Sequence, residues 1–82
     1  MKGYVYVLIS PKDKKQYIGS TNNIKRRLME HNTGKVNSTK YRRPLKLKYL
    51  IEYNTIEEAA RMEKRFKKSH DILRRTLEKS LK

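Results

Sequence analysis

The chain has 82 residues, no cysteine, and a formal net charge of +14 from 22 Lys and Arg against 8 Asp and Glu. A chain of this length forms one domain, residues 1–82, with a modest core. The lack of cysteine excludes disulfides and thiolate metal sites, and no apolar run is long enough to cross a bilayer. We therefore expect a cytoplasmic protein with no membrane partner, whose positive field attracts nucleic acid; a ribosome-bound or merely very soluble basic protein is the alternative.

Two short strands are predicted at the start of the chain. Residues Tyr4–Ile9 and Gln16–Ser20 are rich in β-branched and aromatic side chains, and the Pro-Lys-Asp segment between them favours a turn. Because side chains alternate along a strand, Tyr6 and Tyr17 should share one face of this hairpin, with the valines and isoleucines in the core on the other. Gly19 is interpreted either as a weak strand end or as a point where a ligand approaches the backbone.

A helix is predicted over residues 23–32, with Thr21 or Asn22 as its N-cap. Its inward stripe, spaced at i, i+3, i+4 and i+7, consists of Ile24, Arg27, Leu28 and His31. A charged arginine on an inward face needs a partner. Arg27 therefore either snorkels, pairs with a structural acid, or lines a site together with His31.

Residues 33–44 form a basic loop without periodicity. Ser38, Thr39 and Tyr41 lie between its cations, a composition that suits phosphate contact and base stacking, although a solvated linker is the alternative. The residues expected to contact nucleic acid are Gly19, Lys35, Thr39, Lys40, Arg42 and Arg43.

The remainder of the chain predicts one strand and two helices. Leu45–Tyr53 alternates as a strand that places Leu45, Leu47 and Tyr49 on one face. A second helix begins at a capping box, Thr55-Ile56-Glu57-Glu58, and carries Glu63 on its inward stripe. A third helix, capped by Ser69 or Asp71, has an apolar ridge that serves the core or a partner, namely Leu73, Leu77 and Leu81.

Ionisable side chains at inward positions are typical of a functional site. Hydrolysis of a phosphodiester by in-line attack of water needs a base, positive charge at phosphorus and help for the leaving oxygen. Tyr6 or His31 could accept the proton, and the guanidinium of Arg27 could bind the non-bridging oxygens. Glu63 could hold Mg²⁺ or Mn²⁺, which prefer oxygen ligands.

The order of these motifs resembles the GIY-YIG nuclease superfamily. The first motif is Tyr4-Val5-Tyr6, which has Tyr and Val in place of Gly and Ile, and the second is Tyr17-Ile18-Gly19 unaltered. Arg27 lies ten residues past Tyr17, His31 follows one turn later, and Glu63 lies in a helix that resembles the metal-binding helix of the family. The chain is most similar to the small standalone branch, which is related to the N-terminal nuclease domain of the bacterial excinuclease ABC.

The resemblance implies an α+β fold, a small three-stranded antiparallel sheet flanked by helices in the order β-β-α-β-α-α. It implies a metal-dependent endonuclease that hydrolyses DNA phosphodiester bonds with a single Mg²⁺ or Mn²⁺, in DNA repair or recombination. The implied catalytic residues are Tyr6, Tyr17, Arg27, His31 and Glu63, with Glu63 as the metal ligand. The implied partner is structured or duplex DNA, and RNA is not excluded as an alternative. No appended DNA-binding domain is evident, so binding is expected from the basic loop and helices or from a partner protein that supplies specificity.

Two other classes of protein fit the same residues. A basic nucleic-acid-binding module would keep the fold with little or no catalysis. A structural protein would use Arg27 and Glu63 as a buried ion pair, in which case loss of Glu63 would destabilise the fold strongly.

Overall fold

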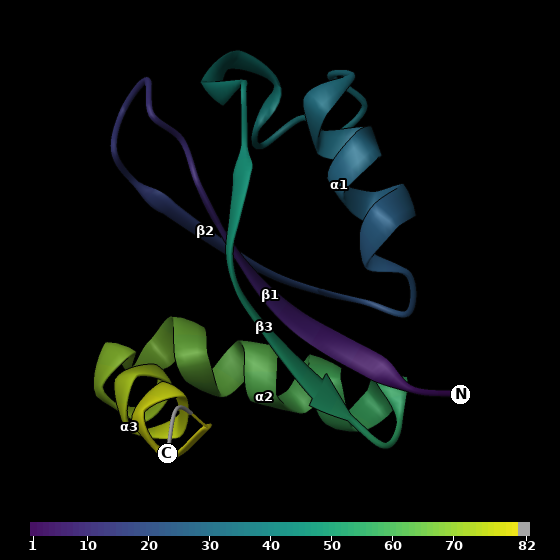
Figure 1. The fold of residues 1–82 in the computed structure, drawn as a ribbon, viewed down its shortest axis with the longest axis vertical. Helices are drawn as coiled ribbons and strands as arrows, with labels where there is room; N and C mark the ends of the chain where they lie inside the picture. The colour runs from purple at the N-terminus through teal and green to yellow at the C-terminus, as the bar shows by residue number, and fades with distance from the viewer. Residues whose placement is uncertain (81–82) are drawn as a thin grey trace.

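The computed structural model describes residues 1–80 and is shown in Figure 1. Its elements are, in chain order, β1 (Gly3–Ile9), β2 (Gln16–Thr21), α1 (Ile24–Asn32), the short 3-10 helix η1 (Lys40–Arg42), β3 (Lys46–Tyr53), α2 (Ile56–Lys68) and α3 (His70–Ser80). The three-stranded sheet with helices in the order β-β-α-β-α-α confirms the predicted α+β fold. Within this described part, no helix combines the length and the apolar character needed to cross a membrane.

The sheet is antiparallel, with β1 between β2 and β3. The predicted hairpin is confirmed by the pairing of β1 with β2 from Tyr4–Thr21 to Ile9–Gln16. On the other side of β1, the register with β3 shifts between Val7 and Leu8. A bulge of this kind reverses the alternation of side chains beyond it. Leu45 therefore packs in a different cluster from Tyr49, so the expectation that both lie on one face was wrong.

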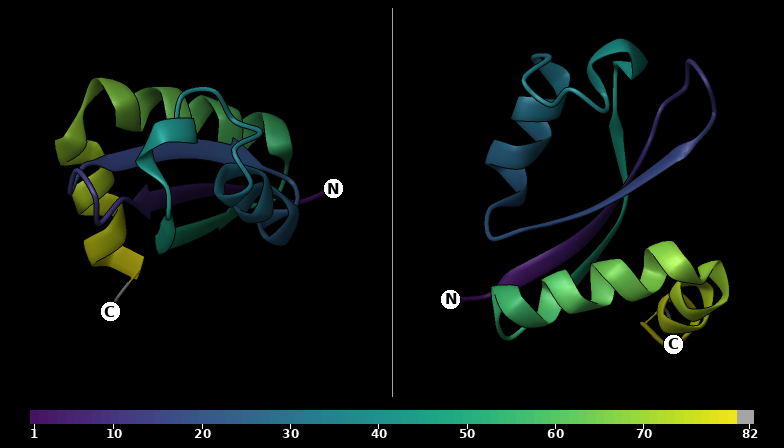
Figure 2. Two further views of the ribbon diagram at one scale, coloured as in Figure 1. Left: turned by 90° about the horizontal axis from the view of Figure 1, so that it is seen from above. Right: turned by 180° about the vertical axis from the view of Figure 1, so that it is seen from behind.

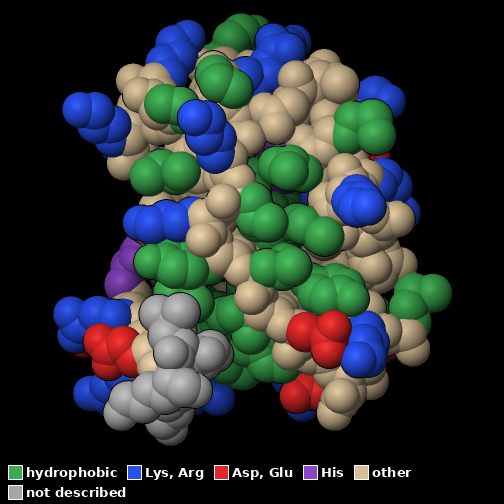
Figure 3. Space-filling model, viewed as in Figure 1, with side chains coloured by type: hydrophobic (Ala, Val, Ile, Leu, Met, Phe, Trp, Pro, Cys, Tyr) green, Lys and Arg blue, Asp and Glu red, His purple; other side chains and the backbone are tan. Residues whose placement is uncertain are grey.

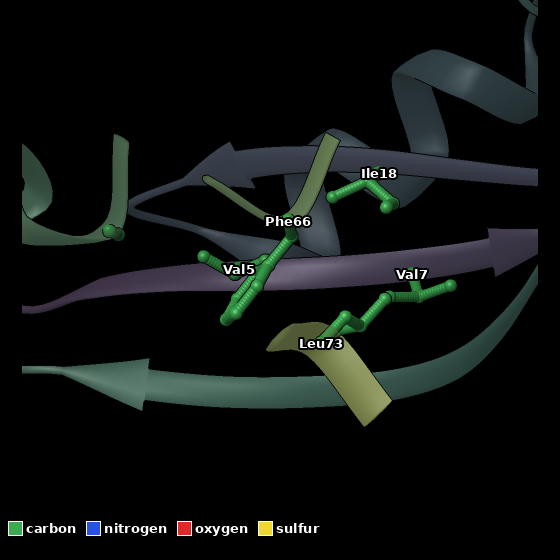
Figure 4. Close-up of a cluster of buried hydrophobic side chains, with 6 residues drawn as sticks. Val5, Val7, Ile18, Phe66 and Leu73 are labelled. Carbon is green, nitrogen blue, oxygen red and sulfur yellow. The ribbon is translucent and has the colours of Figure 1, made fainter. Parts of the chain in front are cut away.

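One face of the sheet carries the larger core, which α2 and α3 cover (Figure 4). It consists of Val5, Val7, Ile18, Ala59, Phe66 and Leu73, with Leu77 packed against it. Core packing is therefore the role of the α3 ridge at Leu73 and Leu77, whereas Leu81 lies outside the described residues. Figure 2 shows α2 lying along the sheet and α3 turning away where α2 ends.

The opposite face carries a second core, covered by α1. Its buried members are Tyr6, Leu8 and Leu45, and the partly buried Tyr17, Ile24 and Leu28 pack against them. The valines are in a core as expected, but the tyrosine face is not left open, because α1 folds back over it from the end of β2 (Figure 2).

Side-chain caps set where the two main helices begin. The N-cap of α1 is Asn23, whose side chain accepts the backbone N–H three residues later at 3.1 Å. Thr21 instead bonds to the backbone of Asn23, so the expected N-cap at Thr21 or Asn22 was wrong. The capping box of α2 is confirmed, because the Thr55 side chain accepts the Glu58 N–H at 3.1 Å.

The basic loop between α1 and β3 is anchored at both ends and is not a free linker. The Asn32 amide bonds both the N–H and the C=O of Leu45, at 2.7 and 3.0 Å. The Ser10 hydroxyl donates to the Arg42 carbonyl at 2.6 Å, and the Arg42 guanidinium pairs with Asp13 at 2.6 Å. The loop is thereby held against α1 and against the tip of the β1–β2 hairpin.

Candidate active site

The candidate site lies at β2, an edge strand around which residues from both faces of the sheet come together. Tyr17 on β2 is at the centre of the cluster. The centroid of its ring is 6.4 Å from that of Tyr6 and 5.0 Å from that of His31. From the other side of the sheet, Lys67 of α2 places its ammonium 5.7 Å from the Tyr17 ring.

A chain of hydrogen bonds runs inward from the Tyr6 hydroxyl. Tyr6 Oη lies 2.9 Å from His31 Nε2, and His31 Nδ1 lies 2.7 Å from Thr39 Oγ1. His31 and Thr39 are both 0% exposed. His31 therefore meets the site through the Tyr6 hydroxyl and the Tyr17 ring and not through solvent.

Arg27, in the first turn of α1, joins this series of hydrogen bonds. Its Nε donates to Tyr6 Oη at 3.3 Å, and its Nη1 pairs with Glu30 at 3.3 Å. Its side chain is 34% exposed, so the guanidinium is open to a ligand. Both contacts are long, and they leave the fork of the guanidinium able to engage a phosphate.

Gly19 makes room for the Tyr6 phenol. The two residues pair directly across β1 and β2, and a Cβ on Gly19 would overlap the Tyr6 hydroxyl and ring. Only glycine lets the phenol lie across β2 toward the edge of the sheet. Gly19 is itself buried, so the group that approaches its backbone is Tyr6, and the expectation of a nucleic-acid contact at Gly19 is corrected.

Glu63 of α2 supplies a carboxylate on the far side of β2. Ser20 Oγ donates to one of its oxygens at 2.5 Å, and Lys67 Nζ lies 2.7 Å from the other. Arg27 pairs with Glu30 and not with Glu63, so the hypothesis of a buried Arg27–Glu63 ion pair was wrong.

Burial sets the protonation of the inner pair. It lowers the pKa of His31 to about 4, with the nearby Arg27 charge adding to the shift, so the imidazole is neutral at physiological pH. Burial also raises the pKa of Tyr6, against the opposing effect of the Arg27 hydrogen bond. The free protein therefore holds Tyr6 as a phenol and His31 as a neutral imidazole.

The residues around Glu63 fit a single hard divalent cation. The described residues contain no group of three or more His, Cys, Asp or Glu side chains able to form a complete metal site. Mg²⁺ and Mn²⁺ sites often use one carboxylate, with water and substrate phosphate as the other ligands. The Glu63 side chain is 21% exposed, so its carboxylate is open to a cation that would take the place of the Lys67 ammonium.

The residues expected to contact nucleic acid have different surroundings. Lys35, Lys40 and Arg43 are exposed, as a phosphate contact requires. Arg42 is committed to Asp13 and to the Lys15 carbonyl. Thr39 is buried against His31, so the expected contact of its side chain with nucleic acid is corrected to an internal hydrogen bond.

Sequence reasoning did not identify four contributions to the site, those of Ser20, Glu30, Thr39 toward His31, and Lys67. Glu30 and Lys67 carry a detectable signal, because each lies three or four residues from its partner on the same helix. Ser20 and Thr39 carry none, since their partners are far away in the chain and a hydroxyl fits many environments.

Comparison with known proteins agrees with this arrangement. A family model described as the GIY-YIG catalytic domain matches residues 2–75. A UPF0213 protein of Syntrophus aciditrophicus is 44% identical over 69 residues, covering 82% of this chain and 78% of that protein. A UPF0213 protein of Streptococcus agalactiae is 46% identical over 65 residues, covering 78% and 73%.

A solved structure has the same fold. The solution NMR structure of a UPF0213 protein from Bacillus halodurans matches with a TM-score of 0.54 at 35% identity, covering 100% of this chain and 86% of that one. The matched region contains both tyrosine motifs, Arg27 and Glu63. The chain therefore belongs to the GIY-YIG nuclease family, among the small UPF0213 proteins.

Proposed function

We propose that this protein is a metal-dependent endonuclease that hydrolyses DNA phosphodiester bonds, in DNA repair or recombination. The observation that carries the proposal is the approach of Tyr6 and Lys67 to Tyr17 at the edge strand, since Tyr6 is hydrogen-bonded to Arg27 and Lys67 is paired with Glu63. A proton acceptor, a phosphate-binding cation and a carboxylate are the parts that phosphodiester hydrolysis needs.

The Thr39 hydroxyl and the Tyr6 phenol together determine which nitrogen of His31 carries the proton. The only hydrogen-bond partner of the Thr39 hydroxyl among the described residues is His31 Nδ1. If Nδ1 carried the proton, the buried hydroxyl hydrogen would lack an acceptor, which costs about 1–3 kcal/mol. When Tyr6 is a phenolate it can only accept hydrogen bonds, so His31 Nε2 then donates to Tyr6 Oη and Thr39 donates to Nδ1.

In this arrangement Tyr6 Oη accepts two hydrogen bonds, from His31 Nε2 and from Arg27 Nε. Donors aimed at an oxygen favour its deprotonated form. Once its phenol proton has been released to solvent, Tyr6 is the residue that accepts the proton of the attacking water, and His31 is a positioning residue that stabilises the phenolate. This assignment chooses between the two proton acceptors that the sequence leaves open.

Arg27 and Tyr17 orient the substrate in this proposal. The guanidinium of Arg27 binds non-bridging phosphate oxygens as charge builds up on them. The partly exposed Tyr17 lies between the Tyr6 and Glu63 sides of the site, where it orients phosphate and water. Glu63 would hold a Mg²⁺ or Mn²⁺, which when bound supplies positive charge to the phosphate and the leaving oxygen.

The test is cleavage of supercoiled and branched DNA by the purified protein with Mg²⁺ or Mn²⁺. Glu63→Gln should abolish metal-dependent nicking, whereas Glu57→Gln, an exposed glutamate on the same helix, should not change it. Both variants should melt within a few degrees of the parent protein. Equal cleavage by the parent and Glu63→Gln would refute the site. Tight binding with no cleavage on any substrate would favour a nucleic-acid-binding module.

A further inference from the structure

An aromatic side chain stands out from the basic loop, close to the candidate active site. Tyr41 in η1 is 77% exposed, whereas Tyr6 on the sheet is 1% exposed. The Lys40 ammonium lies 5.5 Å from the centroid of the Tyr41 ring. At this exposure the ring has room for another flat group beside that cation.

The Tyr41 ring lines a shallow pocket of about 210 Å³ together with three cations, Lys12, Lys40 and Arg43. The pocket has no acidic residue in its lining, so its field favours an anion. Its volume is below the range of about 300–1,000 Å³ that is typical of enclosed small-molecule sites. Figure 3 shows Lys and Arg side chains gathered at the end of the molecule where η1 lies.

The backbone that carries this pocket is fixed before any ligand arrives. Arg43 Nε donates to the Lys40 carbonyl at 2.8 Å, and Arg42 is paired with Asp13 of the hairpin. Thr39, two residues before Tyr41, is hydrogen-bonded to His31 inside the candidate active site. Binding of a ligand to Tyr41 therefore costs little entropy for ordering the backbone, and the ligand is held at a fixed position relative to Tyr6.

We propose that the pocket binds one unpaired nucleotide of a DNA strand, with the base stacked on Tyr41 and the phosphate held by Lys12 and Arg43. A base inside a duplex is stacked on its neighbours and cannot cover an aromatic ring, whereas an unpaired base can. If the proposed nuclease function holds, the substrate has a single-stranded segment next to the bond that is cut. The binding itself does not depend on catalysis.

The replacement Tyr41→Trp gives a direct test, because the chain has no other tryptophan. Titration with a single-stranded oligonucleotide, without added metal, should quench the fluorescence of this tryptophan. An abasic strand of the same length supplies the phosphates without the bases, and at equal occupancy it should leave the fluorescence unchanged.

Binding measured by fluorescence anisotropy supplies the second test. Tyr41→Leu should weaken binding of the single strand by about 5- to 150-fold, the range for loss of one stacked base, and should alter blunt duplex binding far less. Tyr41→Phe keeps the ring and should bind as the parent does. Circular dichroism checks that each variant is folded.

Unchanged tryptophan fluorescence in the saturated complex would overturn the proposal. So would an equal loss of single-strand and duplex affinity in Tyr41→Leu, which would make Tyr41 a contact for phosphates alone. The readouts separate this inference from the nuclease function: quenching without cleavage on any substrate would refute the nuclease only, and cleavage without quenching would refute the nucleotide pocket only.

Discussion

Replacing Thr39 with valine removes one buried hydroxyl and nearly preserves the shape of the side chain. The hydroxyl lies 2.7 Å from His31 Nδ1, and both residues are 0% exposed. Leaving Nδ1 without a partner should cost about 1–3 kcal/mol of unfolding free energy. The same hydrogen bond favours the Nε2–H tautomer of His31, which is the form that donates to a Tyr6 phenolate.

The assay is the ¹⁵N spectrum of the imidazole side chains at neutral pH. The chain has two histidines, and His70→Gln leaves only the signal of His31. The parent protein should show a protonated Nε2 and an Nδ1 that accepts a hydrogen bond. In Thr39→Val the preference for the Nε2–H tautomer should weaken, and nicking should slow. Thr39→Ser keeps the hydroxyl and serves as the matched control, because it should retain the tautomer.

One result would refute this reasoning outright, namely a parent protein with the proton on Nδ1 of His31. The phenol of Tyr6 would then donate to Nε2 and lose one of its two donors, and His31 would become the proton acceptor of the pair. A Thr39→Val protein with unchanged stability would show that the buried hydroxyl has no energetic role.

Three further predictions concern the same region. Gly19→Ala should lower the unfolding free energy by about 1–3 kcal/mol in chemical denaturation and abolish nicking, because its Cβ displaces the Tyr6 phenol; unchanged stability would contradict the close contact. The pKa of His31 is about 4 in the folded protein, against an ordinary value of 6.5. The contribution of His31 to the free energy of unfolding should therefore be fully present above pH 6.5 and fall by up to about 1.4 kcal/mol per pH unit between pH 6.5 and 4. Chemical denaturation of His31→Gln should show most of this pH dependence lost between pH 6.5 and 5, above the range where carboxylates titrate. An equal pH dependence in the parent and in His31→Gln would assign the effect to another group. Replacing the exposed loop cations Lys35, Lys40 and Arg43 by glutamine should reduce the slope of log affinity against log salt concentration by about 0.9 per lost phosphate contact. The control replacement Lys64→Gln on α2 should change the slope less. An unchanged slope in the loop variant would show that the binding surface lies away from these three residues.

The fold was largely predictable because local signals and burial agree along most of the chain. The Thr55 capping box, the alternation of Val5 and Val7, and the leucine spacing of α3 each point to the structure that forms. The register of β3 was not predictable, since a bulge depends on how β1 and β3 meet and leaves no mark in either sequence. The N-cap of α1 was missed by one or two residues because three polar residues in a row can each serve as a cap.

The candidate site was predictable where an ionisable residue breaks an apolar stripe. Arg27, His31 and Glu63 each lie on the inward side of a helix, where solvation alone does not explain a polar side chain. Hydroxyl partners such as Ser20 and Thr39 break no pattern, so only the folded structure identifies them. Thr39 shows the limit most clearly, because its place between the loop cations suggested a phosphate contact and its side chain turned inward.

Tyr6 belongs to the core that α1 covers, whereas Glu63 lies on α2, which covers the other face of the sheet. Tyr6 and Lys67, the partner of Glu63, both reach Tyr17 because β2 is an edge strand of the sheet. Gly19 completes the arrangement, because the missing Cβ lets the Tyr6 phenol lie across that strand toward the Glu63 side. An added strand outside β2 would therefore separate the proton acceptor from the carboxylate even if every side chain of the site were kept.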